Sequence, residues 1–477
     1  MFFNSLHYLI FAPIVILAFF AFSRHRPMQR TLLLIASLYF YAVFEVPFLL
    51  LLLFSISITF FCARMIAASD HVAWRRIWLV SGIAANLGIL YFFKFVDFSF
   101  EIYNYAFHLQ AGQNWHIRPW GVILPVGISF YTLQAMAYVI DVYRKDIEPG
   151  KSLFSFALFL SFFPQLVAGP IMRAKDLLHQ FSEDHPFTIE NFRAGLGIMA
   201  LGFFKKTFMA DPAALVADQV FSNPEQYSTA GIWIGAVAFI FQIYGDFSGY
   251  SDIAIGTGRI MGFHIPRNFM RPFLADRLSD LWSRWHISLS TWLRDYVYIP
   301  MGGSRVNVLR YYFNIFITMA VSGVWHGSGL NYVIWGLYHA ALVVLERMLF
   351  SLPAVERFWD RLPRIARVWY PFVIFVFSGL MFRATAIEGL SAMQTANVMM
   401  LRAILPSTGI LPAISSSVLL AIAILMLVES LVEYRKTIFD KLLANNVIYY
   451  SLTGTILLYC ALVYAMSDSS PFVYFQF

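Results

Sequence analysis

The chain is poor in charge: only 13% of its 477 residues are charged, while 59% are hydrophobic. Soluble domains carry about 25% charged residues, so the composition excludes an ordinary soluble protein. Long polar stretches between the apolar runs are also missing, which excludes separate soluble domains joined by linkers. We therefore predict an all-α polytopic membrane protein that forms one integral membrane domain over residues 1–477.

Cysteine is almost absent, since the chain holds only Cys62 and Cys460, each within an apolar run. Two isolated thiols exclude a disulfide framework. Basic residues outnumber acidic ones by 34 to 27, but they are spread over many loops, as the orientation rule for membrane proteins already requires. We therefore expect membrane lipid around the chain and no nucleic-acid partner.

Apolar runs follow one another along the chain and predict about 11 to 13 membrane spans of about 20 residues each, some of them short or tilted. These runs are Leu9–Phe22, Thr31–Phe44, Phe48–Phe61, Ile77–Phe93, Val122–Tyr138, Leu153–Phe163, Ala230–Tyr244, Asn314–Val324, Tyr332–Leu345, Val368–Phe382, Ile414–Val428 and Ile448–Tyr464.

The first run is read as a retained helix, because no basic segment precedes it and no small-residue cleavage site follows. Arg24, Arg26 and Arg30 come directly after it. The positive-inside rule then places these arginines in the cytoplasm and the N-terminus outside.

Prolines interrupt or bound several runs, at Pro47, Pro125, Pro164, Pro170 and Pro212. Non-helical backbone at membrane depth is tolerated only where protein or a water-filled cavity covers it. We therefore expect an internal cavity. Broken helices are also a feature of transporters, so movement of a substrate without bond formation stays an alternative.

Residues 263–310 differ from their surroundings, because arginines and aromatic residues alternate through them. This segment is too polar to span a membrane, so we predict amphipathic or re-entrant helices at the cytoplasmic face. It is either an interfacial platform or a basic vestibule for an anionic substrate, since arginine suits phosphate. Arg284 is the candidate in this segment for binding substrate.

Two histidines, His286 and His326, each follow a tryptophan, Trp285 and Trp325. Histidine is well suited to moving protons near neutral pH, and an ionisable group at membrane depth is a functional hypothesis by default. The ordinary alternative is a core histidine hydrogen-bonded to a carbonyl group. His339 is read as such a structural residue. The spacing of the three histidines fits no metal site.

Further polar residues lie within or beside apolar runs. Asp246 and Tyr250 are four residues apart, on one face of a helix, and either pack there or line a substrate channel. Gly245 and Gly249 have the small-xxx-small spacing of tightly packed helices. Asn331 follows the glycine-rich segment after His326 and is a further candidate substrate contact.

Five blocks of the chain, in this order, resemble the membrane-bound O-acyltransferase (MBOAT) superfamily, and within it the branch that O-acetylates bacterial exopolysaccharides such as alginate. These blocks are Gly127–Arg144, Phe162–Arg173, Asp246–Gly262, Trp282–Arg305 and Val324–Gly327. The resemblance implies a ring of tilted helices around a central tunnel. It also implies that His326 matches the invariant histidine of the family and His286 a second one.

The same resemblance implies acyl transfer across a bacterial inner membrane. The donor would be a cytosolic thioester, acetyl-CoA or an acyl carrier, bound as a substrate and not as a permanent cofactor. The expected partners are an extracytoplasmic protein of the SGNH-esterase type and the machinery that makes the polysaccharide. Transfer of D-alanine to teichoic acid is the alternative within the superfamily.

Overall fold

The computed structural model describes residues 1–109, 115–387, 390–466 and 472–473. Within these residues the regular secondary structure is helical; strand-like pairing is limited to isolated bridges between Tyr227 and Ile410 and between Ile387 and Leu390. The all-α prediction is confirmed.

Seven helical segments of the described chain are long and apolar enough to cross a membrane. They are Val46–Ala68, Val72–Ala106, Thr229–Ile260, Leu330–Phe350, Arg364–Arg383, Ser416–Tyr434 and Asn446–Met466. Together with a shorter apolar helix at Leu6–Ala21, they make the chain a multi-pass membrane protein. The total of about 11 to 13 spans stays a prediction.

The chain divides into two compact units. Unit 1 comprises residues 1–196 and 254–266, and unit 2 comprises residues 197–253 and 267–477. The prediction of one membrane domain over the whole chain stays a prediction.

Unit 1 is built from short and long helices in chain order. They are α1 (Leu6–Ala21), α2 (Arg26–Ala42), α3 (Val46–Ala68), α4 (Val72–Leu90), η1 (Tyr91–Phe95), α5 (Val96–Ala106), α6 (Ile128–Arg144), α7 (Leu153–Ser161), α8 (Phe163–Leu166), α9 (Ala174–Leu177), η2 (Gln180–Ser182) and the first half of α10 (Ile189–Phe204). The return segment 254–266 joins this unit by a buried hydrogen bond of 2.7 Å between the hydroxyl groups of Tyr8 and Thr257.

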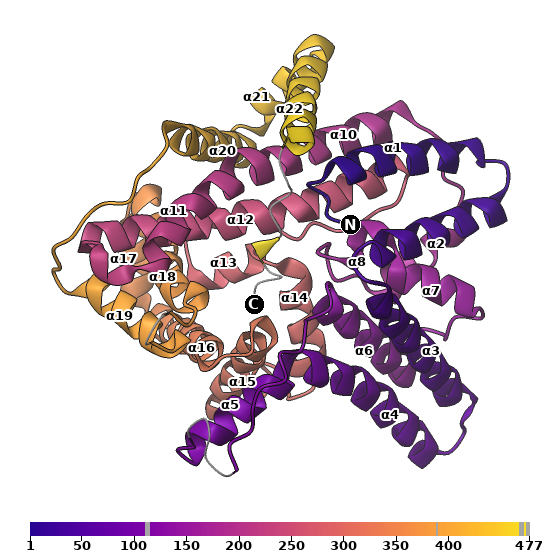
Figure 1. Ribbon diagram of the computed structural model, residues 1–477, viewed down its shortest axis with the longest axis horizontal. Helices are drawn as coiled ribbons and strands as arrows, with labels where there is room; N and C mark the ends of the chain where they lie inside the picture. The colour runs from indigo at the N-terminus through magenta and orange to yellow at the C-terminus, as the bar shows by residue number, and fades with distance from the viewer. Residues whose placement is uncertain (110–114, 388–389, 467–471, 474–477) are drawn as a thin grey trace. The chain divides into compact units, whose positions relative to one another are not determined.

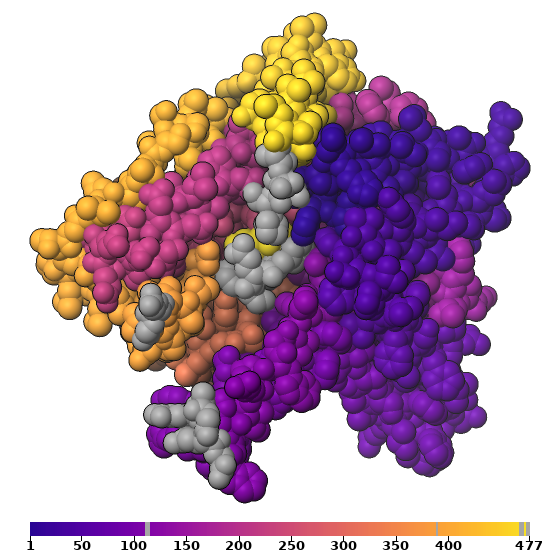
Figure 2. Space-filling model, viewed as in Figure 1, coloured from indigo at the N-terminus to yellow at the C-terminus, as the bar shows by residue number. Residues whose placement is uncertain are grey.

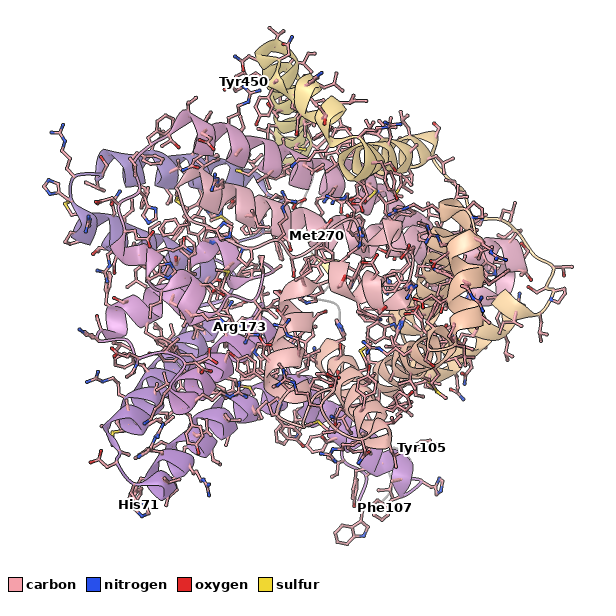
Figure 3. All side chains as sticks on the ribbon, turned by 180° about the vertical axis from the view of Figure 1, so that it is seen from behind. His71, Tyr105, Phe107, Arg173, Met270 and Tyr450 are labelled. Atoms are coloured by element: carbon pink, nitrogen blue, oxygen red, sulfur yellow. The ribbon has the colours of Figure 1, made fainter. Side chains whose placement is uncertain are left out.

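Helices α3, α4 and α6 lie side by side in unit 1 (Figure 1). Their apolar contact includes a small polar group: the Asn86 amide donates to Thr59, and its oxygen accepts from Ser55 at 2.6 Å. Because buried polar groups must be paired in a membrane, this group ties α4 to α3. Tyr105 and Phe107, 83% and 64% exposed, project from the end of α5 (Figure 3). Exposed aromatic rings of this kind are typical of a membrane interface.

Unit 2 begins in the second half of α10 and holds most of the longer helices. It contains η3 (Lys205–Ala210), α11 (Asp211–Ser222), η4 (Pro224–Gln226), most of α12 (Thr229–Ile260), η5 (Pro272–Leu274), α13 (Leu278–Arg284), α14 (Ile287–Leu293), η6 (Arg294–Tyr298), α15 (Val308–His326), α16 (Leu330–Phe350), α17 (Pro353–Arg361), α18 (Arg364–Arg383), α19 (Ala392–Ile404), α20 (Ser416–Tyr434), α21 (Lys436–Ala444) and α22 (Asn446–Met466). Helix α22 lies at the surface of this unit (yellow in Figure 2), and most of its side chains are exposed.

Prolines bound some of the helices but do not break every helix that contains one. Pro47 lies in the first turn of α3, where the missing N–H costs nothing, and Pro164 is the second residue of the four-residue helix α8, directly after α7 has ended. Pro212 does not interrupt its helix, because η3 runs directly into α11 at Asp211. The Arg-rich segment 263–310 forms η5, α13, α14 and η6, none longer than seven residues. None of these four helices is among the candidate spans, whereas their predicted amphipathic or re-entrant character and their place at the cytoplasmic face stay predictions.

Candidate functional site

His326 is the last residue of α15 and is almost fully buried in unit 2, with 3% exposure. Aromatic rings surround its imidazole: the ring centroids of Trp325, Trp335 and Phe382 lie 5.0, 5.2 and 5.3 Å away. The ring of His286 follows at 6.4 Å. The structure therefore brings the two predicted histidines together, although they are 40 residues apart in the sequence.

Glycines let α16 pass close to α15 at this point. A Cβ atom on Gly323 would lie 2.3 Å from the carbonyl oxygen of Tyr332, and one on Gly327 would lie 2.2 Å from the Tyr332 ring. Any side chain at these positions would push the start of α16 away from His326. The glycines on either side of His326 therefore allow α15 and α16 to pack closely.

A narrow cavity opens beside His326 within unit 2. Its walls are Phe239, Ile240, Ile243, Trp285, His326, Trp335, Phe375, Ser378, Gly379 and Phe382. Its volume of about 20 Å³ is enough for one methyl-sized or water-sized group. No charged side chain of the described residues lines it. The Ser378 hydroxyl accepts from Trp335 Nε1 and donates to the Phe375 carbonyl, so the cavity is apolar apart from His326.

His286 precedes α14 and is 2% exposed. Its ring contacts Phe247 and Trp325, with centroid distances of 4.6 and 5.6 Å. Burial lowers the pKa of His286 to about 3, because a charged ring loses its hydration in this aromatic environment. The ring is therefore neutral at physiological pH. Its backbone lies in the left-handed region, with φ 45° and ψ 52°, a conformation that costs a non-glycine residue about 1–3 kcal/mol.

The two tryptophans next to the histidines have different places. Trp285 lines the cavity and packs against Phe375, with a centroid distance of 4.8 Å. Trp325 contacts both histidine rings, with centroid distances of 5.6 Å to His286 and 5.0 Å to His326. That the two tryptophans bind substrate stays a prediction.

Arg284 is engaged in ion pairs. Its guanidinium contacts Asp280 at 2.9 Å and Glu433 at 3.1 Å, and Arg271 contacts the same Glu433 carboxylate at 2.7 Å. A role for Arg284 in binding substrate stays a prediction, but its charge is already balanced here. The choice between an interfacial platform and a basic vestibule stays open; Arg267 of the same segment is exposed.

Asp246 and Tyr250 lie in the buried part of α12. Asp246 pairs with Lys206 at 2.7 Å and accepts the backbone N–H of Val473. Tyr250 stacks on Phe472 with a centroid distance of 4.8 Å. Neither residue lines the cavity. The packing alternative fits these contacts better than the channel alternative.

Asn331 is also taken up by structural contacts. Its amide donates to the carbonyl oxygens of Met381 and Ala384, at 3.0 and 3.4 Å. These bonds tie the start of α16 to the end of α18, directly behind Phe382. Asn331 thus supports the cavity wall without lining it.

His339 differs from the prediction of a hydrogen-bonded core histidine. Its side chain is fully buried, and its ring centroid lies 4.8 Å from that of Trp335 and 5.0 Å from that of Trp282. Neither ring nitrogen has a hydrogen-bond partner among the described residues. No group of three or more potential metal-binding side chains occurs in the part of the chain that the structure describes.

Sequence reasoning missed residues that complete the site. Gly379 and Phe382 belong to an apolar run that reads as an ordinary span, and nothing in the run singles them out. Asn268 lies 18 residues before His286 and contacts its ring. The only sequence signal for Asn268 is a polar amide in a segment of unusual composition.

Comparison with known proteins agrees with the family resemblance found in the sequence. Residues 149–386, which include both site histidines, match the family model of the membrane-bound O-acyltransferase family. The chain is 40% identical over 366 residues to "Probable alginate O-acetylase AlgI" of Pseudomonas aeruginosa, which covers 76% of this chain and 68% of that protein.

Two further relatives carry other names. "Peptidoglycan O-acetyltransferase" of Helicobacter pylori is 35% identical over 407 residues, covering 79% of this chain and 76% of that protein. "Teichoic acid D-alanyltransferase" of Bacillus subtilis is 28% identical over 255 residues, covering 48% of this chain and 60% of that protein.

Proposed function

Because the chain belongs to the membrane-bound O-acyltransferase family, we propose that it moves an acetyl group from a cytosolic thioester across the membrane, for O-acetylation of an exopolysaccharide such as alginate. The coarser activity is plain from the family: the chain is a multi-pass membrane O-acyltransferase. The observation that carries the finer proposal is the small apolar cavity beside His326.

In the proposed reaction a hydroxyl oxygen attacks the thioester carbonyl carbon. The new C–O bond forms, the C–S bond breaks, and His326 accepts the hydroxyl proton and then returns it to the leaving thiolate. A positioned base of this kind contributes about 10² to 10⁴ in rate. Family resemblance assigns His326 this role, and its place in the cavity wall supports it.

The size and polarity of the cavity favour acetyl over D-alanyl. An acetyl group presents one methyl group, which fits the available volume of about 20 Å³. A D-alanyl group adds an ammonium ion, and a buried charge needs a partner. No carboxylate among the described residues lines the cavity. The higher identity to proteins named for O-acetyl transfer supports the same choice.

The remaining parts of the proposal concern the surroundings of the enzyme. The donor is acetyl-CoA or an acyl carrier, which binds as a substrate, and the acceptor is an extracytoplasmic protein of the SGNH-esterase type that passes the group to the polymer. The chain lies in the bacterial inner membrane with its N-terminus outside. Arg24, Arg26 and Arg30 after the first apolar helix support this orientation.

The alternative of a transporter without catalysis is disfavoured. The broken helices that the sequence predicts are a feature of transporters, and the structure contains breaks between its helices. The relatives, however, are named as an O-acetylase and as transferases.

The test is to measure ester-linked acetyl on the secreted polysaccharide of the host. Wild type, a deletion strain and His326→Ala are compared at matched membrane abundance. We expect acetyl to be lost in the deletion strain and in His326→Ala while polymer secretion continues. His264→Ala is the matched control, because this histidine is exposed. Full acetylation in His326→Ala would overturn the catalytic assignment.

A further inference from the structure

Asn268 caps helix α14 with both its backbone and its side chain. Its carbonyl oxygen accepts the N–H of Ile287 at 2.9 Å, and its side-chain oxygen accepts the N–H of Ser288 at 3.1 Å. The first N–H groups of a helix have no partner within the helix, so a residue outside α14 satisfies two of them. Asn268 is 1% exposed, and its amide nitrogen donates to Ser251 Oγ at 3.3 Å.

These contacts decide which way round the Asn268 amide lies. The Ser288 N–H can only donate, so the atom that faces it must be the oxygen. The same oxygen lies 3.3 Å from Nδ1 of His286. An oxygen that cannot donate requires a proton on Nδ1, and in a neutral ring the second nitrogen, Nε2, then carries the lone pair.

We propose that Asn268 is a positioning residue, which holds His286 in the tautomer with its proton on Nδ1, so that Nε2 serves the acyl-transfer site as a hydrogen-bond acceptor and not as a donor. The role of Nε2 in acyl transfer rests on the proposed function. The tautomer itself depends only on the contacts of Asn268, Ser288 and His286.

The left-handed backbone of His286 fits this role. With φ at 45° the residue turns its ring back toward Asn268, and the hydrogen bonds of Ile287 and Ser288 to Asn268 hold the turn in place. Strained backbone of this kind persists only where the surroundings over-determine it. The ring is held further by edge contact with Phe247 and Trp325.

The titratable groups near His286 come from several helices. Among the described residues, the ring of His326 on α15 contacts that of His286. On α12, Asp246 is paired with Lys206, and Tyr250 is stacked on Phe472. On α13, Arg284 is paired with Asp280 and Glu433. Asn268 is itself uncharged, so it selects a tautomer without favouring the charged ring.

This assignment separates two roles that an imidazole could have at this position. A protonated His286 would donate to the oxyanion of the tetrahedral intermediate. A neutral His286 with its lone pair on Nε2 instead accepts a hydrogen bond, and so can orient the attacking hydroxyl group. The Asn268 contact selects the second role.

The direct test is ¹⁵N nuclear magnetic resonance of the full-length protein in lipid nanodiscs, with labelled histidine. The chain has 11 histidines, and the His286 signals are those lost in His286→Gln. If that variant does not accumulate, the through-space contact with a labelled Asn268 side chain assigns them. We expect a protonated Nδ1 and an unprotonated Nε2 between about pH 5 and 8. A protonated Nε2 in this range would overturn the proposal.

The second test is the pH profile of acetyl transfer from acetyl-CoA or a loaded carrier, in membranes that contain equal amounts of folded protein. Asn268→Leu removes the acceptor, and we expect transfer to fall at least tenfold. Asn268→Asp keeps an acceptor but adds a negative charge, which favours the charged imidazole. Because that form has no lone pair on Nε2, activity should be lost on acidification at a higher pH than in the wild type.

The matched control is Asn314→Asp. Asn314 is a buried asparagine of the same unit, whose amide donates to the Gly303 carbonyl at 3.0 Å. This variant should keep the wild-type pH profile. An unshifted profile in Asn268→Asp would contradict the inference and leave the proposed function standing. Acetylation that survives His326→Ala would contradict the proposed function and leave the tautomer result standing.

Discussion

Helix α12 contributes to two buried regions of unit 2 that differ in almost every respect. Phe239, Ile240 and Ile243 form part of the cavity beside His326, where no charged side chain of the described residues is found. Further along the helix, about one turn and about two and a half turns past Ile243, Asp246 and Asp252 face Lys206 and Lys205 in ion pairs of 2.7 Å. We call the first region the cavity and the second, with Asp211, the ion cluster.

The comparison shows two ways in which this chain accommodates polar side chains in an apolar environment. In the ion cluster each charge has a partner, which offsets the cost of desolvation. In the cavity none of the lining side chains of the described residues is an Asp, Glu, Lys or Arg, so a small acyl group meets aromatic surface and one imidazole. A fixed charge beside His326 would attract water, which competes with the acceptor hydroxyl for the thioester.

Apart from the loss of catalysis in His326→Ala, the largest effect that we expect is a loss of folding stability when the ion cluster is disrupted. Lys206→Met leaves Asp246 and Asp211 without their shared cation, which lies 2.7 Å from each. Breaking a buried pair costs about 3–5 kcal/mol. We expect a large fall in the thermal unfolding temperature in detergent. Lys206→Met combined with Asp246→Leu should recover part of the loss; a double variant no more stable than the single one would show that the pair is not the cause.

A smaller effect, on activity alone, is expected at the back of the cavity. A Cβ atom on Gly379 would lie 3.0 Å from Ile240 and 3.2 Å from Phe239. Gly379→Ala therefore takes up space beside His326 that the acetyl methyl group would occupy, and it should lower transfer about tenfold, which corresponds to about 1.4 kcal/mol in the activation free energy. The unfolding temperature should stay near that of the wild type. Unchanged transfer would mean that the acyl group is held elsewhere.

The converse change widens the cavity. Ile240→Ala should let propionyl thioester compete with acetyl thioester, because one methylene group in an apolar pocket is worth about 1–3 kcal/mol, or 10- to 200-fold. The ratio of the two products from a mixture of donors is the measurement. Val344→Ala is a matched control, since this buried residue does not line the cavity. Equal selectivity in the two variants would argue against the cavity as the acyl site.

The smallest effect is expected at an ion pair outside both regions. Arg383 contacts Asp218 at 2.9 Å, and the Asp218 side chain is 51% exposed. Asp218→Asn should change stability by about 0–1 kcal/mol, as is usual for exposed pairs. Set beside Lys206→Met, this variant separates the effect of burial from that of charge pairing. If Asp218→Asn destabilised the protein as much as Lys206→Met does, burial would not explain the cost of breaking the Lys206 ion pairs.

The sequence predicts the class of fold and the two site histidines because these signals are local. Apolar runs define helices, proline bounds some of them, and a tryptophan–histidine pair at the end of a run stands out by chemistry. The close packing at Gly245 and Gly249 was also predictable, and a Cβ atom on either would approach backbone oxygen to within 2.8 Å.

The rest depends on contacts between residues far apart in the chain. Glu433 holds Arg271 and Arg284 from about 150 residues away, which no periodicity reveals. Phe382 and Gly379 reach the cavity from α18, in a run indistinguishable from its neighbours. Lys205 and Lys206 look misplaced in an apolar helix until Asp252 and Asp246 are seen beside them.

Unit 1 consists of two separate segments of the chain, residues 1–196 and 254–266, and this affects when it can fold during synthesis. The hydrogen bond between Tyr8 and Thr257 spans 249 positions of the sequence, so the ribosome must translate residues 197–253, which belong to unit 2, before unit 1 can close. Helix α1 therefore enters the membrane long before its partner exists. A fragment that stops at residue 196 would keep the apolar helices of unit 1 but lack the segment that completes them.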